Sequence, residues 1–326
     1  MRVFLTILCY FYFLRAFSSS PEITVIHQGK GTATDSSYYD LLKINESTFL
    51  VAGKYGVLQT INNKGIIRSH KHPLLGEDIF RLIQLSPDSV LACADHGNLM
   101  FYNIHNGGYR IKHFQGMDSY CMYNACLVNN KELFVCGGKS AIAHSKRVIP
   151  FGFIMRSDDG GVTWKKVYSS PFHMVWCVIH DSARQQLNAL VYRPNSSHIL
   201  KSRIEKNHFR HLKRIGKGMY HELQQDASGG WTATGGTLGK EGWYKSSFSV
   251  KKMFNTGMIW SRGTCHDREL FPASYGKLIS VSKGHETTLD MPLEKPFNLY
   301  ECGFFDEQQA LVVGSAQTVL LIRFND

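Results

Sequence analysis

The sequence predicts an all-β fold, a seven-bladed β-propeller with four-stranded blades, and two regularities predict it. An aromatic residue at the start of a short apolar run recurs seven times, at separations of 40 to 53 residues. A second apolar run ends fourteen residues after each aromatic residue. A repeat of about 40 residues is the length of a four-stranded propeller blade. The seven aromatic residues are Tyr39, Phe80, Tyr123, Trp176, Tyr220, Trp260 and Tyr300.

The second repeat illustrates the four expected strands, lettered a to d from the central channel outward. We predict strand a at 78–85, strand b at 89–94, strand c at 97–104 and strand d at 108–114. These runs are rich in β-branched and aromatic residues, and Gly, Asn, Asp and Ser separate them, as strands and tight turns require. No convincing amphipathic helix interrupts them.

The two ends of the chain predict how the ring closes. The seventh repeat has strands at 299–305, 310–314 and 318–324, so its fourth strand is missing. The strand-like run 22–27 belongs to no other repeat. We therefore expect it to pair with the last blade as the outer strand and to close the ring.

The first twenty residues have the layout of a secretory signal peptide. Arg2 precedes an apolar run at 3–14, and small residues at 16–20 follow Arg15. The run is too short to span a bilayer, which needs about 20 residues in a helix. We predict a signal peptide at 1–20, a single propeller domain at 21–326, and a secreted or periplasmic protein with no transmembrane segment after cleavage.

Charge and residue spacing limit the classes of partner and cofactor. The chain carries a formal net charge of +11, and the part after residue 20 about +9, which favours an acidic partner. The eight cysteines include no Cys-x-x-Cys pair, and the histidines show no His-Glu-x-x-His pattern. We predict no metal, no cofactor and no nucleic-acid partner, and we expect a monomer.

The segment 157–164 carries a recognisable motif in the third repeat. Ser157, Asp159, Gly161, Thr163 and Trp164 match the pattern Ser-x-Asp-x-Gly-x-Thr-Trp at every defined position. The chain thus resembles the Asp-box (BNR repeat) β-propeller superfamily, which includes sialidases, other glycan-active enzymes and the photosystem II assembly-factor type. The motif is expected to be structural, because its Asp accepts backbone N–H bonds, its Gly tolerates unusual dihedrals and its Trp packs between sheets.

The resemblance leaves two function classes open. The first is a noncatalytic recognition or assembly module that binds an acidic partner, either an anionic glycan or a protein. The alternative is a glycan-active enzyme, a glycoside hydrolase or polysaccharide lyase. Sialidase activity is not expected, since the Arg-Ile-Pro motif of sialidases is absent and seven blades differ from their six.

Strand direction predicts which face binds. If the four strands alternate in direction, the d–a and b–c connections share one face, and the 157–164 turn lies on the opposite face. The two longest b–c connections, at 138–150 and 236–242, then project beside the channel entrance. We call this the d–a/b–c face and predict that it binds the ligand.

The candidate site residues follow from this placement. The repeat aromatic residues are expected to pack between blades, while the residue after each one lies near the entrance. Register leaves the parity open, because a shift of one residue exchanges the two sets. The predicted ligand-binding residues are Arg81, Asn124, Arg147, Trp176 and Arg262.

Each candidate has a chemical reason. Arg81, Arg147 and Arg262 present forked donors suited to a carboxylate or sulfate. In an enzyme, His221 with Tyr220 or Tyr123 would move a proton, as a lyase requires. Asp40 and Glu301 would be the paired carboxylates of a glycosidase.

Overall fold

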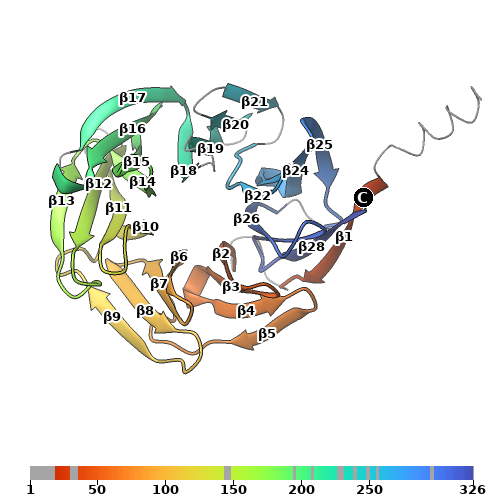
Figure 1. Cartoon of the computed structure of the whole chain (residues 1–326), viewed down its shortest axis with the longest axis horizontal. Helices are drawn as coiled ribbons and strands as arrows, with labels where there is room; N and C mark the ends of the chain where they lie inside the picture. The colour runs from red at the N-terminus through yellow and green to blue at the C-terminus, as the bar shows by residue number, and fades with distance from the viewer. Residues whose placement is uncertain are drawn as a thin grey trace, which may run out of the picture.

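Seven four-stranded antiparallel sheets surround a central axis like the blades of a propeller (Figure 1). The computed structural model describes residues 19–29, 36–142, 148–193, 196–206, 209–225, 231–237, 241–246, 250–254, 257–293 and 297–325. Within these ranges every blade keeps the predicted strand order, so the all-β, seven-bladed prediction is confirmed.

The innermost strands are β2 (Tyr38–Asn45), β6 (Ile79–Ser86), β10 (Cys121–Leu127), β14 (Met174–Asp181), β18 (Met219–Gln225), β22 (Gly263–Cys265) and β26 (Leu299–Phe304). The b strands are β3 (Thr48–Gly53), β7 (Ser89–Ala94), β11 (Leu133–Ile142), β15 (Gln186–Arg193), β19 (Trp231–Thr237), β23 (Arg268–Pro272) and β27 (Gln309–Gly314). The c strands are β4 (Leu58–Asn62), β8 (Asn98–Asn103), β12 (Val148–Ser157), β16 (Ser196–Arg203), β20 (Glu241–Ser246), β24 (Lys277–Ser282) and β28 (Val319–Asn325). The outer strands are β5 (Gly65–Ser69), β9 (Tyr109–His113), β13 (Lys165–Ser170), β17 (Arg210–Lys217), β21 (Val250–Phe254), β25 (His285–Asp290) and β1 (Ser19–His27). Three short 3-10 helices are η1 (Lys54–Gly56), η2 (Ile204–Lys206) and η3 (Ser274–Gly276).

Burial falls from the middle of a blade to its outer edge. Every residue of β3 is buried, whereas four of the five residues of β5 are exposed. Facing blades bury apolar side chains between them, as Leu50 and Ala52 of one blade do with Leu82 of the next. This explains why the b strands read as continuous apolar runs.

The N-terminal strand completes the last blade, as predicted. β1 pairs antiparallel with β28, with Glu22 opposite Arg323 and Thr24 opposite Leu321. The two chain ends are thereby held in one sheet. The seven sheets remain separate hydrogen-bonded units, so the ring is not one continuous ladder and the blades meet through side-chain packing.

Residues 1–18, which include most of the predicted signal peptide, lie outside the described ranges. β1 begins at Ser19, so the strand overlaps the last two residues of the predicted peptide. No helix among the described residues is long and apolar enough to cross a membrane. The seven cysteines in the described ranges are all free thiols.

A one-residue bulge near the start of the innermost strand explains the aromatic repeat. In blade two, Ile79 pairs with Ala94 and Arg81 pairs with Cys93, which leaves Phe80 unpaired between them. The same shift occurs in five other blades, and in blade six Trp260 follows the isolated bridge at Ile259. A bulge redirects its side chain, and here it turns one ring per blade toward the axis.

Blade five corrects the predicted repeat by one residue. Tyr220 pairs with Gly235 and Glu222 pairs with Thr234, so His221 occupies the bulge. Tyr220 instead packs into the core, where 1% of its surface is exposed. The aromatic repeat was assigned to Tyr220 because Tyr220 is the aromatic residue directly before His221.

A small residue faces the start of most innermost strands. In six blades the partner of the residue before the bulge is Gly or Ala. A Cβ added at Gly53 would lie 1.9 Å from the carbonyl oxygen of Ser37, which leaves no room for a side chain. In three blades the position fourteen residues after the repeat aromatic residue is one residue away from the observed partner. These positions are Leu190, Thr234 and Ser274. The observed partners are Gly53, Ala94, Gly137, Val191, Gly235, Ala273 and Gly314.

The 157–164 turn connects β12 to β13, on the face predicted for it. Asp159 accepts the Thr163 hydroxyl at 2.6 Å and the backbone N–H groups of Val162 and Thr163 at 3.0 and 2.9 Å. These hydrogen bonds, first of all the one from the Thr163 side chain, lower the pKa of Asp159. The Ser157 hydroxyl accepts the Gly161 N–H at 2.8 Å. The turn therefore supplies its own hydrogen bonds, which supports a structural role.

Candidate functional site

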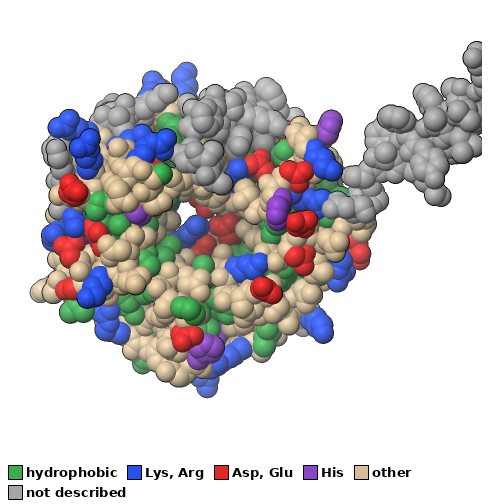
Figure 2. All heavy atoms as spheres, in the orientation of Figure 1, with side chains coloured by type: hydrophobic (Ala, Val, Ile, Leu, Met, Phe, Trp, Pro, Cys, Tyr) green, Lys and Arg blue, Asp and Glu red, His purple; other side chains and the backbone are tan. Residues whose placement is uncertain are grey.

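A cavity of about 400 Å³ lies on the propeller axis, and its walls come from the innermost strands. Figure 2 shows it as a hollow at the centre of the molecule, with acidic and basic side chains visible inside. Its lining residues lie at or just before the first few positions of those strands, at the d–a/b–c face. They are Tyr39, Phe80, Arg81, Tyr123, Asn124, Trp176, Met219, His221, Glu222, Trp260, Tyr300 and Glu301.

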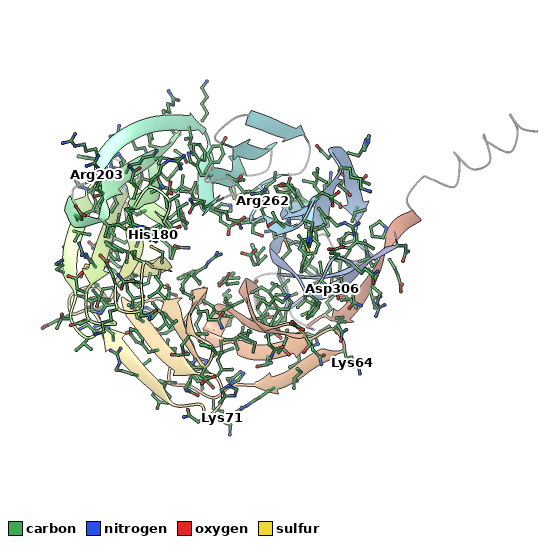
Figure 3. All side chains as sticks on the ribbon, in the orientation of Figure 1. Lys64, Lys71, His180, Arg203, Arg262 and Asp306 are labelled. Atoms are coloured by element: carbon green, nitrogen blue, oxygen red, sulfur yellow. The ribbon has the colours of Figure 1, made fainter. Side chains whose placement is uncertain are left out.

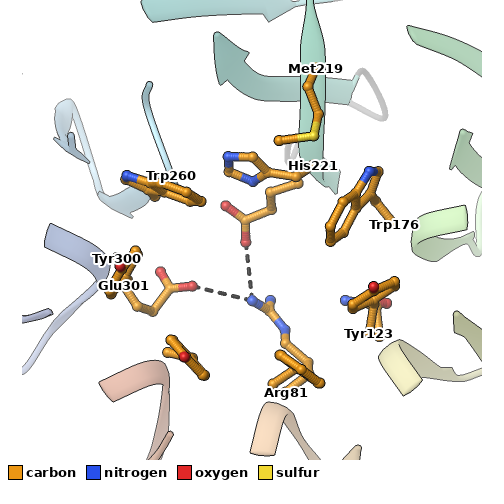
Figure 4. Close-up of a pocket in the computed structure, with 12 residues that line it drawn as sticks. Arg81, Tyr123, Trp176, Met219, His221, Trp260, Tyr300 and Glu301 are labelled. Carbon is orange, nitrogen blue, oxygen red and sulfur yellow. Dashed lines mark hydrogen bonds and ion pairs between the residues drawn. The ribbon is translucent and has the colours of Figure 1, made fainter. Parts of the chain in front are cut away.

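Seven rings, one from each blade, form the wall of the cavity (Figure 4). Ring contacts run from His221 through Trp260, Tyr300, Tyr39, Phe80 and Tyr123 to Trp176, with centroid separations from 4.3 Å for Tyr123 and Trp176 to 5.8 Å for Tyr39 and Phe80. His221 continues the series by stacking on Trp260 at 5.0 Å, with an interplanar angle of 25°. We call these residues the ring wall: Tyr39, Phe80, Tyr123, Trp176, His221, Trp260 and Tyr300.

The ring wall corrects the predicted orientation of the repeat aromatic residues. They were expected to pack between blades, but six of the seven are half-buried and face the cavity, while Tyr220 is in the core. The residue after each ring lies deeper, and six of these seven residues are buried. The bulge exchanges the two sets, because one inserted residue reverses the side-chain parity of a strand.

A charge cluster of one arginine and three carboxyl groups forms the floor. Arg81 Nη1 lies 3.2 Å from a carboxylate oxygen of each of Asp40, Glu222 and Glu301. The three carboxyl side chains keep 3, 7 and 9% of their surface exposed, whereas Arg81 keeps 27%. These four residues, which we call the floor cluster, come from four different blades and meet only because the ring is closed.

The floor cluster has unsatisfied acceptor capacity. Glu222 Oε1 accepts hydrogen bonds from Arg81 and from Gln224 Nε2, both at 3.2 Å. Its other oxygen, Oε2, is buried and has no hydrogen-bond partner among the described residues. Asp40 and Glu301 each accept one backbone N–H, from Leu82 and Cys302. Glu222 is therefore the least satisfied carboxyl group of the cluster.

Burial changes the ionisation of the site. Desolvation raises the pKa of Asp40 and Glu222, although Arg81 opposes the rise. Desolvation and the neighbouring Glu222 raise the pKa of Glu301 well above its usual range. Burial lowers the pKa of His221 to about 4, so its ring is neutral at pH 7. One guanidinium thus does not provide enough positive charge for three carboxylates.

The expectation that Arg81 holds an anionic ligand stays a prediction, and the surroundings of Arg81 argue against it. Its guanidinium already faces three carboxyl groups, so an added carboxylate or sulfate would increase an existing excess of negative charge. The basic residues responsible for the net charge lie elsewhere. Lys64, Lys71 and Arg203 are exposed at the outer edge of the molecule (Figure 3).

The other predicted site residues differ in whether they line the cavity. Arg262 does not line the cavity, since its guanidinium contacts Glu269 and donates to Thr232 Oγ1 at 3.1 Å. Tyr220 is buried in the core and away from the cavity, so it cannot act with His221 on a ligand there. Asn124 and Trp176 line the cavity. Arg147 lies outside the described residues, and the 138–150 connection begins as a continuation of the β11–β12 hairpin.

Sequence reasoning missed an exposed apolar rim on the same face. Four large side chains occupy d–a or b–c connections, with exposed fractions between 51 and 71%. Two of them, Tyr55 and Tyr275, adopt positive φ values of 58° and 62°, which are uncommon for residues other than Gly. The tyrosines directly before Gly56 and Gly276 were the available signal. We call these four residues the apolar rim: Tyr55, Leu75, Phe172 and Tyr275.

Two polar side chains tie the rim to the ring wall. Asp78 accepts the backbone N–H of Tyr55 at 3.0 Å and the hydroxyl of Tyr39 at 3.3 Å. Asn298 accepts the N–H of Tyr275 at 3.3 Å in the corresponding place before Tyr300. The rim and the wall are thus built as one surface. The described residues bring no group of three His, Cys, Asp or Glu side chains together in a geometry that could hold a metal ion.

Comparison with solved structures agrees with the fold. YCF48 bound to D1 peptide superposes with a TM-score of 0.64 and 12% identity, covering 95% of this chain and 96% of that one. YCF48 from Cyanidioschyzon merolae gives a TM-score of 0.62 and 14% identity, covering 92% and 98%. The Cps50 (Swd1) propeller domain of Myceliophteria thermophila gives 0.65 and 10% identity, covering 94% and 100%. No protein-family model and no curated protein sequence matches the chain.

Proposed function

We propose that this protein is a noncatalytic recognition module that binds a polypeptide partner on the d–a/b–c face. The observation that carries the proposal is the cavity of about 400 Å³ enclosed by the ring wall at the centre of that face. A concave, mostly apolar site with a few convergent polar groups is the usual form of a binding site. The propeller holds these groups on seven rigid strands, so they need little rearrangement to bind.

The apolar rim favours a polypeptide over a small ligand. Leu75 and Phe172 lie in d–a connections on the face that carries the cavity, outside its walls, and keep 71% and 64% of their surface exposed. Aromatic and apolar side chains are enriched in the buried centres of protein interfaces. The solved YCF48 structure, which contains a bound peptide, supports the choice because it shares this fold.

Backbone strain in the rim is a second support. Non-Gly residues in the left-handed region cost free energy and concentrate at functional sites. Tyr55 and Tyr275 adopt it in equivalent b–c connections of two different blades, and both side chains remain exposed. His96 and Ala316 adopt the same region in the b–c connections of two further blades, so the conformation belongs to these turns. The exposure of the two tyrosine rings is what supports a binding role.

The proposal also includes export from the cell and an acidic partner, and both rest on the sequence alone. The 1–20 segment supports secretion, and the net charge of +11 supports an acidic protein or glycan at the exposed basic edge. The floor cluster argues against an anionic group inside the cavity. We therefore place any acidic surface of the partner outside the ring wall.

Glycan turnover is the second candidate, and one observation favours it. Glu222 and Glu301 are neighbouring buried carboxyl groups with raised pKa values, and a general acid needs a carboxyl group that keeps its proton. In this site, however, the same carboxyl groups are ligands of Arg81. That arrangement fixes their position but reduces their freedom to reach a sugar.

The test is selection of a random peptide library displayed on phage against the immobilised propeller. Peptides that bind should lose at least ten-fold in affinity with Trp176→Ala and with Leu75→Ser, and should bind Val162→Ser normally. Val162 is a matched control because it is 64% exposed in the 157–164 turn, on the opposite face. Uronate-rich, sulfated and neutral glycans, assayed for binding and cleavage, form the competing arm. No enriched peptide, an equal loss with Val162→Ser, or cleavage of any glycan would overturn the proposal.

A further inference from the structure

We infer that the central cavity takes an organic cation, the ammonium or guanidinium end of a basic side chain presented by the partner. This inference rests on the proposed function for its source, a polypeptide, but the chemistry follows from the cavity itself. Two independent features converge on it, the composition of the ring wall and the charge of the floor cluster.

The ring wall suits a cation. The faces of Trp, Tyr and Phe rings carry partial negative charge and attract ammonium and guanidinium groups, and surrounding a cation with several rings is an established way to bind it. Here six Phe, Tyr and Trp side chains and the neutral His221 line a single cavity. An alkyl stem and a charged end can both be accommodated, because the rings also offer apolar contact.

The floor cluster lacks one or more positive charges. Glu222 and Glu301 both line the cavity, and both contact the same guanidinium nitrogen of Arg81 (Figure 4). Glu222 is 6% exposed and its Oε2 has no hydrogen-bond partner in the described part of the chain. An entering ammonium group would supply N–H donors to carboxylate oxygens that have too few.

The alternatives fit these atoms less well. An anion would meet Arg81 but would add a fourth negative group to a cluster that already has three carboxyl groups for one guanidinium. A neutral apolar side chain would fill the ring wall and leave Glu222 unsatisfied. A basic side chain is the ligand end that uses both the wall and the floor.

The inference is tested with small probes, independently of any partner. Nα-acetyl-lysine amide, Nα-acetyl-arginine amide, the norleucine analogue and the glutamate analogue are titrated into the full propeller by calorimetry. At least one basic probe should bind ten-fold or more tightly than norleucine, and glutamate should bind most weakly. A norleucine or glutamate probe that equals or exceeds both basic probes would overturn the inference.

Variants locate the binding. Glu222→Gln keeps the size of the side chain and should weaken the basic probe at least ten-fold, while Trp176→Leu should weaken it by removing one ring. Glu46→Gln removes the same charge at an exposed a–b turn on the opposite face and should change nothing. Equal weakening by Glu46→Gln would show a nonspecific charge effect and refute the site. Circular dichroism confirms that each variant is folded.

The two proposals fail separately. If library peptides bind through the rim and the ring wall but contain no essential Lys or Arg, the cation inference is wrong and the recognition function stands. If the basic probes bind in the cavity but no peptide is enriched, the polypeptide proposal is wrong and the cation site stands.

Discussion

Arg81 Nη1 lies 3.2 Å from Glu222 Oε1, although 141 residues separate them along the chain. The contact crosses the channel from blade two to blade five. It exists only when the blades between them are assembled, so it reports both the closure of the propeller and the state of its central cavity. The first two predictions follow from this relationship.

Removing the guanidinium should destabilise the fold strongly. Arg81→Met leaves Asp40, Glu222 and Glu301 buried without their shared cation, and breaking such an ion cluster costs about 3–5 kcal/mol. Urea unfolding at neutral pH measures the loss, and exposed Lys64→Met is the control for a removed positive charge. The loss should shrink in acid, where the carboxyl groups take up protons. A loss below about 1 kcal/mol, within the range of exposed ion pairs, would contradict the cluster's role.

Glu301→Gln should make the protein more stable at high pH. The pKa of Glu301 is raised in the fold by burial and by Glu222, so the folded state favours the protonated form. Stability from this group is present below its unfolded pKa of about 4.3 and is lost as pH rises through the folded value. Glu301→Gln has no carboxyl group to ionise at this position, so it does not lose stability in this way.

The measured quantity is the difference in unfolding free energy between Glu301→Gln and the wild type, from pH 4 to pH 9. It should grow with rising pH, because the wild type loses stability as Glu301 ionises and the variant does not. Asp40, Arg81, Glu222 and Cys302 all face this carboxyl group, so the transition will be broad. A difference that falls with rising pH would show that the carboxylate is stabilised in the fold.

Tyr55→Gly should stabilise the fold while weakening partner binding. Tyr55 has φ 58°, a conformation that costs an L-residue about 1 kcal/mol and costs Gly almost nothing. A rise in unfolding free energy of that order, together with at least ten-fold weaker binding of a library peptide, is the expected pair of results. Unchanged binding with improved stability would remove the rim from the interface.

Trp164→Ala should cost about 3 kcal/mol of stability, near the lower end for emptying an aromatic site, because the side chain is only half-buried. Its ring packs edge-on against Phe114 at 5.6 Å and its indole N–H donates to the Gly161 carbonyl at 3.1 Å. Peptide and probe affinities of the folded protein should not change. Loss of binding with normal stability would show that the binding site lies on the face of the 157–164 turn and not on the d–a/b–c face.

The sequence predicted the blades well because strand order, turn residues and the repeat length are local properties. The binding face that it predicts stays a prediction. The sequence could not assign which residues face the cavity, since a one-residue bulge near the start of six innermost strands reverses that parity. In blade five His221 occupies the bulge and Tyr220 does not. The pairing of Tyr220 with Gly235 determines this, and the residue type does not.

The charge of the cavity could not be predicted either, for a different physical reason. A net charge of +11 is a property of the whole chain, whereas the cavity is governed by one arginine and three carboxyl groups. Those four residues are spread between positions 40 and 301. Their convergence depends on the closed ring, and no local pattern in the sequence predicts it.

The central claim is that Arg81 supplies too little positive charge for the three carboxyl groups around it, so that the cavity can accept a further cation. Proton exchange on binding tests this claim most directly. Calorimetric titration of Nα-acetyl-lysine amide in buffers of different ionisation enthalpy measures the protons released, between about pH 5 and pH 8, where His221 is neutral. An entering cation lowers the raised pKa values of Glu222 and Glu301, so we predict net proton release that is abolished in the Glu222→Gln, Glu301→Gln double variant. Proton uptake, or binding with no proton exchange in the wild type, would contradict the account.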